Sequence, residues 1–367
     1  MPQHNEENER IKRRYFTYLR EARRYSEASV EAAAMAIDRF DTFHGRRSFK
    51  AFHRERAVAF KRKLADQRAA RSGEPLSKST LDSTLRALVA FFSWLADQPE
   101  YRSRFTESDA EHFNLSLAES RAGRAQRPRS FPTLEQVHHV LASMPHATDI
   151  ELRDRALIAL TLLTAARDGA LRSLRLKHLR LDERCIDQNP REVATKFSKQ
   201  ITTWFFPVGG EAETIVRDWT VHLHRDLSWG PDDPLFPKTL MTVGKSGGFE
   251  PAGLDRGFWS TTGPVRRIFH EAFEASGQPY CHPHAIRHTI SKLGTQLCST
   301  PEQMKAWSQN LGHDHVLTTL TSYGSVPSER QADLIRAMNP QADPSPGDEA
   351  KREIEDLLNQ ALKKVRR

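Results

Sequence analysis

Apolar residues in the first 120 positions recur at the spacing of amphipathic helices. From Ser77 onward they alternate at intervals of four and three, so that they line one helix face. Two earlier stripes of the same kind predict helices around residues 30–40 and 57–64, and no strand pattern appears. We therefore expect a small all-α domain of four or five helices with Arg and Lys on its outer faces. The residues of the three stripes are Val30, Ala33, Ile37 and Phe40; Ala57, Phe60 and Leu64; and Leu81, Leu85, Leu88, Phe92 and Leu95.

The helical pattern resumes at Thr133, where the sequence TLEQ fits a capping box. The stretch 152–164 is apolar on most sides, which predicts a buried central helix, and two more helices are expected near 211–227 and 257–276. Before residue 211, the runs RCIDQ, REVATKF and QITTWFFPV favour strands and predict a small three-stranded antiparallel sheet. The whole chain is thus expected to be mainly α, with one small sheet in its second part.

Two segments interrupt these patterns and divide the chain. Residues 121–132, RAGRAQRPRSFP, hold four arginines and almost nothing apolar, which is typical of a basic linker. The run NPQADPSPGDE is typical of a hinge because it is rich in Pro, Asp and Gly. We therefore expect a helical domain at 1–120, a second domain at 133–340, and a tail at 341–367.

The tail ends in a predicted amphipathic helix. Ile354, Leu357, Leu358, Ala361 and Val365 fall on one face, with acidic residues early and basic residues late, as suits the helix dipole. An apolar face of this kind must be covered, either by its own domain or by a neighbouring subunit. The sequence leaves both arrangements open.

The excess of basic charge lies in the first part of the chain. Residues 1–130 hold 26 Lys and Arg against 18 Asp and Glu, whereas the rest of the chain holds 29 of each sign. Basic clusters occur at 10–14, 20–24, 46–50 and 61–63. Such a surface suits a polyanion such as nucleic acid, but it would serve solubility equally well. Charge raises the question of a nucleic-acid partner without deciding it.

Other features argue against several classes of protein. No apolar run approaches the roughly 18 residues that a membrane helix needs, and the first residues lack the apolar stretch of a signal peptide. The three cysteines, Cys185, Cys281 and Cys298, are scattered and odd in number, which argues against a disulfide framework and fits a reducing cytoplasm. We expect a folded cytoplasmic protein that has no membrane partner.

The densest group of chemically capable side chains lies between His284 and Tyr323. The motif HAIRHT holds His284, Arg287 and His288, and a Leu-Gly-His turn then places His313 ten residues before Tyr323. Arginine is suited to binding phosphate, and histidine to transferring protons near neutral pH. This stretch is therefore the first candidate for a catalytic site.

With two upstream residues, the group resembles the tyrosine recombinase (phage integrase) family. Arg167 follows the predicted central helix, and Lys196 falls late in the second predicted strand. The family has an arginine, a hairpin lysine, His-x-x-Arg, a His or Trp after Leu-Gly, and a tyrosine, and this sequence has them in the same order. The resemblance covers about residues 131–340. The first domain matches the family's core-binding domain in its helical type but in no motif.

The resemblance implies DNA strand exchange without a metal or another cofactor. Tyr323 would attack a phosphodiester of double-stranded DNA and form a 3′-phosphotyrosyl link, which keeps the bond energy so that strands are rejoined without ATP. Arg167 and Arg287 would hold the non-bridging oxygens and stabilise the charge that builds on them. The hydroxyl of tyrosine has an ordinary pKa of about 10, so it needs a nearby base. The biological setting would be integration, excision or resolution of a mobile element.

The remaining residues of the motif receive supporting roles from the same resemblance. His284 would act in acid–base catalysis, Lys196 would protonate the leaving 5′-oxygen, and His313 would donate a hydrogen bond to the phosphate. His288 would be structural. Lys199 is a second candidate for the lysine, since it lies in the turn that follows the predicted strand.

One position departs from the family pattern. The family commonly has an acidic residue three positions after the first arginine, and Ala170 stands there in this chain. Asp168 is nearby, but it falls on a different helix face. The sequence therefore does not identify the residue that orients Arg167.

Three other functions remain open on the same residues. A zinc site is suggested by a cluster of histidines, although no HExxH glutamate and no cysteine pair accompany them. A DNA-binding protein of the same fold with impaired catalysis would explain Ala170, and a type IB topoisomerase would use the same chemistry as a monomer. The two-part build and the tail favour a recombinase that is a monomer or dimer in solution and a tetramer on two DNA sites. The histidines are His282, His284, His288, His313 and His315.

Overall fold

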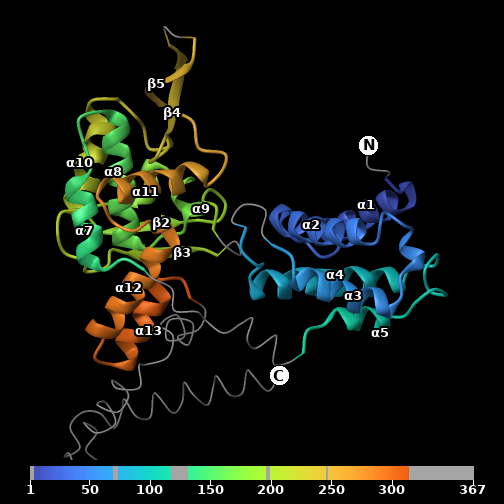
Figure 1. Ribbon diagram of the computed structural model, residues 1–367. Coiled ribbons are helices and arrows are strands. Elements are labelled where there is room, and N and C mark those ends of the chain that lie inside the picture. The colour runs from blue at the N-terminus through green and yellow to red at the C-terminus, as the bar shows by residue number, and fades with distance from the viewer. Residues whose placement is uncertain (1–3, 69–72, 117–130, 196–198, 245–246, 314–367) are drawn as a thin grey trace, which may run out of the picture. The chain divides into compact units, whose positions relative to one another are not determined.

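The computed structural model describes residues 4–68, 73–116, 131–195, 199–244 and 247–313. The chain forms two compact units, Met1–Arg127 and Pro128–Arg367 (Figure 1), and each has its own hydrophobic core. No described helix combines the length and the apolar character that crossing a bilayer requires. Most of the predicted linker and the whole predicted tail lie outside the described residues.

The described part of the first unit is helical, as the apolar stripes predict. Its core is built largely from phenylalanine rings: Phe52 stacks on Phe92 at 4.1 Å between ring centroids, and Phe40 meets Phe92 and Phe113 edge to face. Such pairs stabilise a core beyond the area they bury. The elements are α1 (Glu6–Glu21), α2 (Glu27–Phe43), η1 (Phe49–Ala51), α3 (Arg54–Ala65), α4 (Lys78–Ala96), α5 (Glu107–Ala110) and η2 (Glu111–Phe113).

Helix α4 shows how closely the stripe determines the packing. Ser77 caps the helix, because its side chain accepts a hydrogen bond from the backbone N–H of Thr80 at 3.1 Å. Most of the predicted apolar face is buried in the core. Asp82 is the exception to the pattern: it lies off the stripe yet is buried, and it pairs with Arg86 at 2.8 Å.

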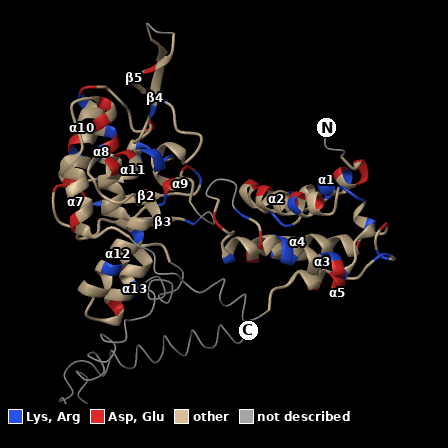
Figure 2. Ribbon diagram, viewed as in Figure 1, with Lys and Arg blue, Asp and Glu red and all other residues tan. Residues whose placement is uncertain are grey.

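Many basic residues of the first unit have an acidic partner within it. Figure 2 shows basic and acidic segments interspersed along its helices. Lys12 is buried and pairs with Asp41 at 2.5 Å, which corrects the prediction that the cluster at 10–14 lies wholly on the surface. On the surface, Arg20 pairs with Glu27 at 2.8 Å. Exposed pairs of this kind contribute little stability, but each places an acidic group beside a cation that could otherwise face a polyanion.

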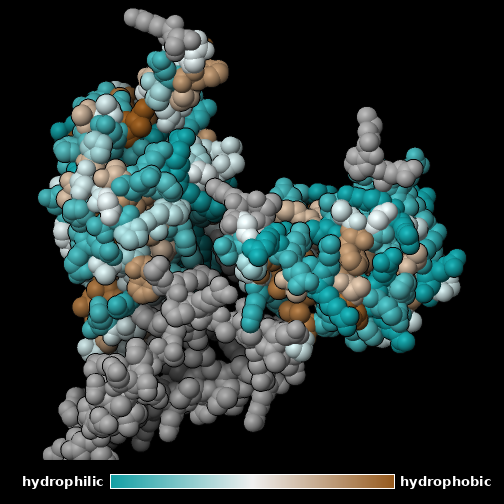
Figure 3. Space-filling view, in the orientation of Figure 1, coloured by the Kyte–Doolittle hydropathy of each residue, from teal (hydrophilic) through white to brown (hydrophobic). Residues whose placement is uncertain are grey.

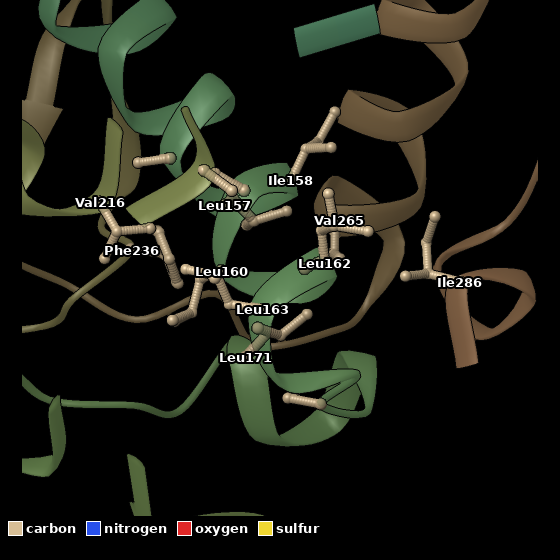
Figure 4. Packing of buried hydrophobic residues seen from close by; sticks show 14 of the residues in the cluster. Leu157, Ile158, Leu160, Leu162, Leu163, Leu171, Val216, Phe236, Val265 and Ile286 are labelled. Carbon is tan, nitrogen blue, oxygen red and sulfur yellow. The ribbon is translucent and has the colours of Figure 1, made fainter. Parts of the chain in front are cut away.

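The second unit packs around α8 (Asp149–Thr164), the central helix that the sequence predicts. Its apolar residues point in all directions, and every residue from Ala156 to Thr164 is buried. Leu157, Leu160, Leu162 and Leu163 meet apolar side chains of the surrounding segments (Figure 4). The other helices are α7 (Leu134–Ser143), α9 (Asp168–Leu171), η3 (Leu176–His178), α10 (Ala212–Arg225), α11 (Gly263–Ala275), α12 (Pro283–Leu297) and α13 (Pro301–Asn310).

A three-stranded antiparallel sheet is present, but its strands differ from the predicted ones. The order is β1 (Leu179–Arg180), β2 (Cys185–Gln188) and β3 (Ile201–Trp204). The run REVATKF is not the middle strand: residues 191–195 form a turn and a loop between β2 and β3. The backbone N–H groups of Glu192 and Val193 both donate to the carbonyl of Asn189, which turns the chain instead of extending it. The β-branched residues there misled the prediction, because β propensity depends on context.

A second sheet was not predicted at all. Strands β4 (Lys238–Val243) and β5 (Phe249–Asp255) form an antiparallel hairpin that projects from the second unit (Figure 1). Both of its faces are largely exposed, so its sequence lacks the alternation that marks a half-buried strand. Most of the surface facing the viewer in Figure 3 is hydrophilic, whereas Val243 and Phe249 of the hairpin are exposed apolar residues. The buried Arg153 holds the base of the hairpin by donating to the Pro237 carbonyl at 3.0 Å.

Candidate active site

Arg167 stands at a sharp junction between two helices. Helix α8 ends at Thr164, and the φ of its C-cap residue Ala165 is 50°, in the left-handed region; Arg167 then serves as the N-cap residue of α9. A left-handed conformation costs a non-glycine residue about 1–2 kcal/mol, and the surrounding fold must offset that cost. The junction turns the chain directly after the most buried helix, which places Arg167 at the end of the core.

Helix α12 carries the His-x-x-Arg motif. Arg287 is only 5 % exposed and donates through Nη1 to the carbonyl of Ala165 and through Nη2 to the carbonyl of Leu311. A guanidinium can serve two carbonyls at once because its donors form a planar fork. Arg287 therefore joins the junction before Arg167 to the turn before His313.

That turn explains why the sequence has Leu-Gly-His. The N–H of His313 donates to the carbonyl of Ser308 at 3.1 Å and the N–H of Gly312 to that of Gln309 at 2.7 Å, which is a Schellman motif at the end of α13. Gly312 has a φ of +68°, and a Cβ there would lie 2.8 Å from Cδ1 of Ile201. Only glycine meets both requirements without strain.

The turn brings His313 against Arg287. Nη2 of Arg287 lies 3.3 Å from Nε2 of His313. A guanidinium has donors only, so Nε2 is the acceptor and the proton of a neutral His313 is on Nδ1. The Nδ1–H of a neutral His313 is then a hydrogen-bond donor.

Burial and neighbouring charges lower the pKa values of two residues of the site. Burial, followed by the charge of Arg167, lowers the pKa of Arg287 to about 9. The His284 ring is partly open to solvent, yet burial against protein, followed by the charge of Arg287, lowers its pKa to about 4. Arg167 also lowers the pKa of His284. His284 is therefore neutral at physiological pH and able to accept a proton.

We expect this pKa to appear in the pH dependence of stability. Because the pKa of His284 is about 4 in the folded protein and 6.5 ordinarily, the unfolded chain binds more protons between these values. The free energy of unfolding should therefore fall as the pH is lowered from about 6.5 towards 4. In the His284→Gln variant, the free energy of unfolding should fall less steeply with pH, as measured by urea titrations at several pH values. An identical pH dependence in the two proteins would show that His284 has its ordinary pKa.

Neither the predicted lysine nor the tyrosine can be placed, since Lys196 and Tyr323 lie outside the described residues. Lys199 is described and lies on the same connection between β2 and β3. The chain just before Lys196 is held close to the end of α9: the N–H of Ala194 donates to Oγ of Ser173, two residues after that helix, at 2.8 Å. The structure therefore keeps both lysines as candidates.

The acidic residue of the family pattern has no direct substitute at its usual position. Ala170 is buried in the core of the second unit. Asp168 pairs instead with Arg266 of α11, at 2.9 Å. The position at which the family commonly has an acidic residue is thus occupied by a buried methyl group, and the nearby Asp168 is paired with another residue.

The histidines do not form a metal site within the described part of the chain. There, no three His, Cys, Asp or Glu side chains are grouped so as to hold a metal ion. The ring of His284 contacts those of His282 and His288, with centroids 6.2 and 5.5 Å apart. His315, the fifth histidine of the zinc hypothesis, lies outside the described residues.

Comparison with known proteins decides the family. The model of the phage integrase family matches residues 132–330, and that of its N-terminal SAM-like domain matches residues 13–100. This chain belongs to the phage integrase family. The chain is therefore a site-specific recombinase of the tyrosine type, which confirms the enzyme class expected from the motif.

Named relatives of this integrase are similar over most of its length. Tyrosine recombinase XerC of Xanthomonas axonopodis pv. citri is 26 % identical over 276 residues, which cover 75 % of this chain and 76 % of the relative. Tyrosine recombinase XerC of Shewanella amazonensis is 23 % identical over 344 residues, with 90 % and 95 % covered.

Solved structures confirm the predicted fold class. XerH site-specific recombinase bound to its difH substrate has a TM-score of 0.56 at 15 % identity, with 89 % of this chain and 83 % of that chain covered. A lambda integrase (75–356) dimer bound to a COC′ core site has the same TM-score and identity, with 86 % and 94 % covered. At this identity the likeness shows the fold alone.

Sequence reasoning missed the groups that hold the site together. The carbonyls of Ala165 and Leu311 bind Arg287, but every residue has a carbonyl, so nothing in the sequence marks these two. Asn310 precedes the Leu-Gly-His motif and binds the backbone of Trp204. No helix was predicted at 301–310, so no sequence pattern marked Asn310 as the residue that ends one.

Proposed function

We propose that this integrase cuts and rejoins double-stranded DNA through a covalent 3′-phosphotyrosyl intermediate on Tyr323. It acts at a specific site, without metal or ATP, during integration, excision or resolution of a mobile element. It works in the cytoplasm, associated with the bacterial nucleoid when it is on DNA. DNA-bound structures of the fold support the choice of partner, since XerH and lambda integrase are both seen on their DNA sites.

The observation that carries this proposal is the convergence of two arginines and two histidines. Arg167, His284, Arg287 and His313 come from three separate stretches of the sequence, yet they influence or contact one another. The charge of Arg167 lowers the pKa of Arg287, so the two guanidinium groups are near enough to interact, and an anion bound by both would offset their repulsion. A phosphodiester has the required charge, and it gains more in the transition state of transfer.

The roles follow from what each group can donate or accept. Arg167 and Arg287 hold the non-bridging oxygens, and His313 donates to the phosphate through its Nδ1–H. Neutral His284 takes the proton of the Tyr323 hydroxyl as its oxygen attacks phosphorus. The bond from phosphorus to the 5′-oxygen breaks, and that oxygen takes a proton from Lys196.

The test is to trap the covalent intermediate. A DNA site nicked beside the cleavage position loses a short fragment after attack, so religation is impossible and the adduct accumulates. We expect wild-type protein to form an adduct that resists denaturation, and Tyr323→Phe to form none, because phenylalanine lacks the attacking oxygen.

Tyr280→Phe is the matched control, because Tyr280 is a half-exposed tyrosine of the same unit outside the motif. It should form the adduct at the wild-type rate. An adduct that persists in Tyr323→Phe would assign the nucleophile to another residue, and none with wild-type protein would reject cleavage altogether.

A second function is favoured by Ala170. Its buried methyl group stands where the family commonly has a carboxylate, so a sequence-specific DNA-binding protein with impaired cleavage is the alternative. The trapping experiment separates the two, since that protein would bind its site and form no adduct.

We further propose that the tail binds a neighbouring subunit and helps a tetramer to assemble on two DNA sites. A groove of about 600 Å³ lies beside the end of α13, and Trp204, Leu297 and Trp307 are among the residues that line it. Leu297 is half-exposed, so the groove offers apolar surface to an amphipathic helix.

Deleting residues from 345 onward should therefore leave binding to a single DNA site intact and impair pairing of two sites. Gel-shift assays with one and two sites would distinguish these steps. Recombination by the truncated protein at the wild-type rate would reject exchange of the tail between subunits.

A further inference from the structure

Asn310, the last residue of α13, binds the free edge of the three-stranded sheet. Its Oδ1 accepts from the N–H of Trp204 at 2.8 Å, and its Nδ2 donates to the carbonyl of Trp204 at 2.9 Å. On β2, Cys185 is the residue opposite Trp204, so the amide stands on the other edge of β3, where a fourth strand would be. The hydroxyl of Thr203 also donates to the Asn310 carbonyl, at 3.3 Å.

The residues that follow Asn310 are fixed one after another. The carbonyl of Leu311 accepts from Arg287, and Gly312 lies close to the side chain of Ile201 of β3, so that a Cβ there would be 2.8 Å from Cδ1. His313 then meets Arg287. The turn is thus held between β3 on one side and Arg287 on the other.

We infer that Asn310 is a positioning residue for His313. By joining the end of α13 to β3, Asn310 sets the direction in which the turn leaves the helix. That direction in turn sets the position of the His313 ring relative to Arg287. The inference rests on the proposed function, in which His313 donates to the scissile phosphate.

The chemistry of the contact requires a side-chain amide. At the edge of a strand, one residue presents an N–H donor and a carbonyl acceptor. A side-chain amide can form hydrogen bonds with both at once. Aspartate would keep the acceptor for the N–H of Trp204 but would set a negative charge against its carbonyl. Leucine has a similar size and offers neither group.

The experiment measures covalent adduct formation by wild type, Asn310→Leu, Asn310→Asp and His313→Ala, at a temperature at which each is folded. A misplacement of about 1 Å can cost roughly 100-fold in rate, so we expect a 10- to 100-fold loss in each Asn310 variant. Adding His313→Ala to Asn310→Leu should cost nothing further, because the group being positioned is absent. Glu302→Gln, at an exposed position of the same helix that does not line the groove beside α13, is the control and should react at the wild-type rate.

Substrates with sulfur in place of one non-bridging oxygen separate positioning from general stability. Sulfur accepts hydrogen bonds poorly, so wild-type protein should be slowed most on the diastereomer in which sulfur faces His313. This slowing should shrink by the same factor in His313→Ala and in both Asn310 variants. A variant that is merely less stable would react more slowly on every substrate and keep the wild-type ratio between diastereomers.

Three results would overturn the inference. They are wild-type rates in both Asn310 variants, an unchanged ratio between diastereomers, and losses that multiply in the double variant. Each leaves the proposed function standing as long as wild-type protein forms the adduct. No adduct with wild type on any substrate would reject the function, and the inference with it.

Discussion

Arg287→Lys is expected to lower the rate of covalent adduct formation about 100- to 1,000-fold, as is typical when a preorganised donor to a developing oxyanion is lost. Lysine cannot reach the carbonyls of Ala165 and Leu311 and the phosphate together, because it lacks the planar fork of donors. A lysine at this position would also lose its proton more readily than an arginine. Burial and the charge of Arg167 lower the pKa of Arg287, and they would act in the same direction on a lysine, whose ordinary pKa is only about 10.4.

Arg153→Lys is the matched control. Arg153 is 2 % exposed and donates to the carbonyl of Pro237, so it is as buried as Arg287, but it anchors the β4–β5 hairpin. Both variants should lower the melting temperature. Only Arg287→Lys should slow cleavage by the folded protein in single-turnover assays on nicked DNA. Equal losses in the two variants would mean that Arg287 acts through stability alone.

Gly312→Ala is expected to slow adduct formation by about tenfold or more and to lower stability as well. The left-handed conformation alone costs alanine about 1–2 kcal/mol. The added Cβ would also lie 2.8 Å from Cδ1 of Ile201, so either that side chain or the turn must shift. A shift of the turn moves His313 relative to Arg287, and positioning errors of this size are costly in catalysis.

Gly277→Ala separates the two effects. Gly277 has nearly the same φ, +67° against +68°, but a Cβ there would meet no atom within 4 Å. Urea titrations should show a similar backbone penalty in both variants and an added loss in Gly312→Ala. Cleavage should fall only in Gly312→Ala. Normal cleavage by Gly312→Ala would show that the turn tolerates the displacement.

The sequence predicts best where one face of a helix must be buried. The stripe on α4 and the all-round apolar pattern of α8 led directly to buried helices, because burial constrains which positions are apolar. The β4–β5 hairpin was missed because both of its faces are largely exposed. The run REVATKF was misassigned because residues suited to strands also occur in a turn that is anchored by other contacts.

The candidate site was predictable as a set of side chains but not as a structure. Motif spacing selected Arg287 and His313, which do contact each other. It did not reveal that a carbonyl of the left-handed Ala165 binds Arg287, nor that Asn310 joins the turn to β3. These contacts join segments more than 100 residues apart. A local sequence pattern contains no information about contacts between segments so distant in the chain.

The ion pairs of the first unit have a consequence for the energetics of DNA binding. A cation that reaches a phosphate contributes to affinity largely by releasing condensed counterions, and the number released sets how steeply affinity falls with salt. Lys12 is buried with Asp41, and Arg20 already neutralises Glu27. Such residues release fewer ions than their number suggests. The salt dependence of binding should therefore follow the small set of cations that face the DNA, well below the 26 basic residues of this part of the sequence.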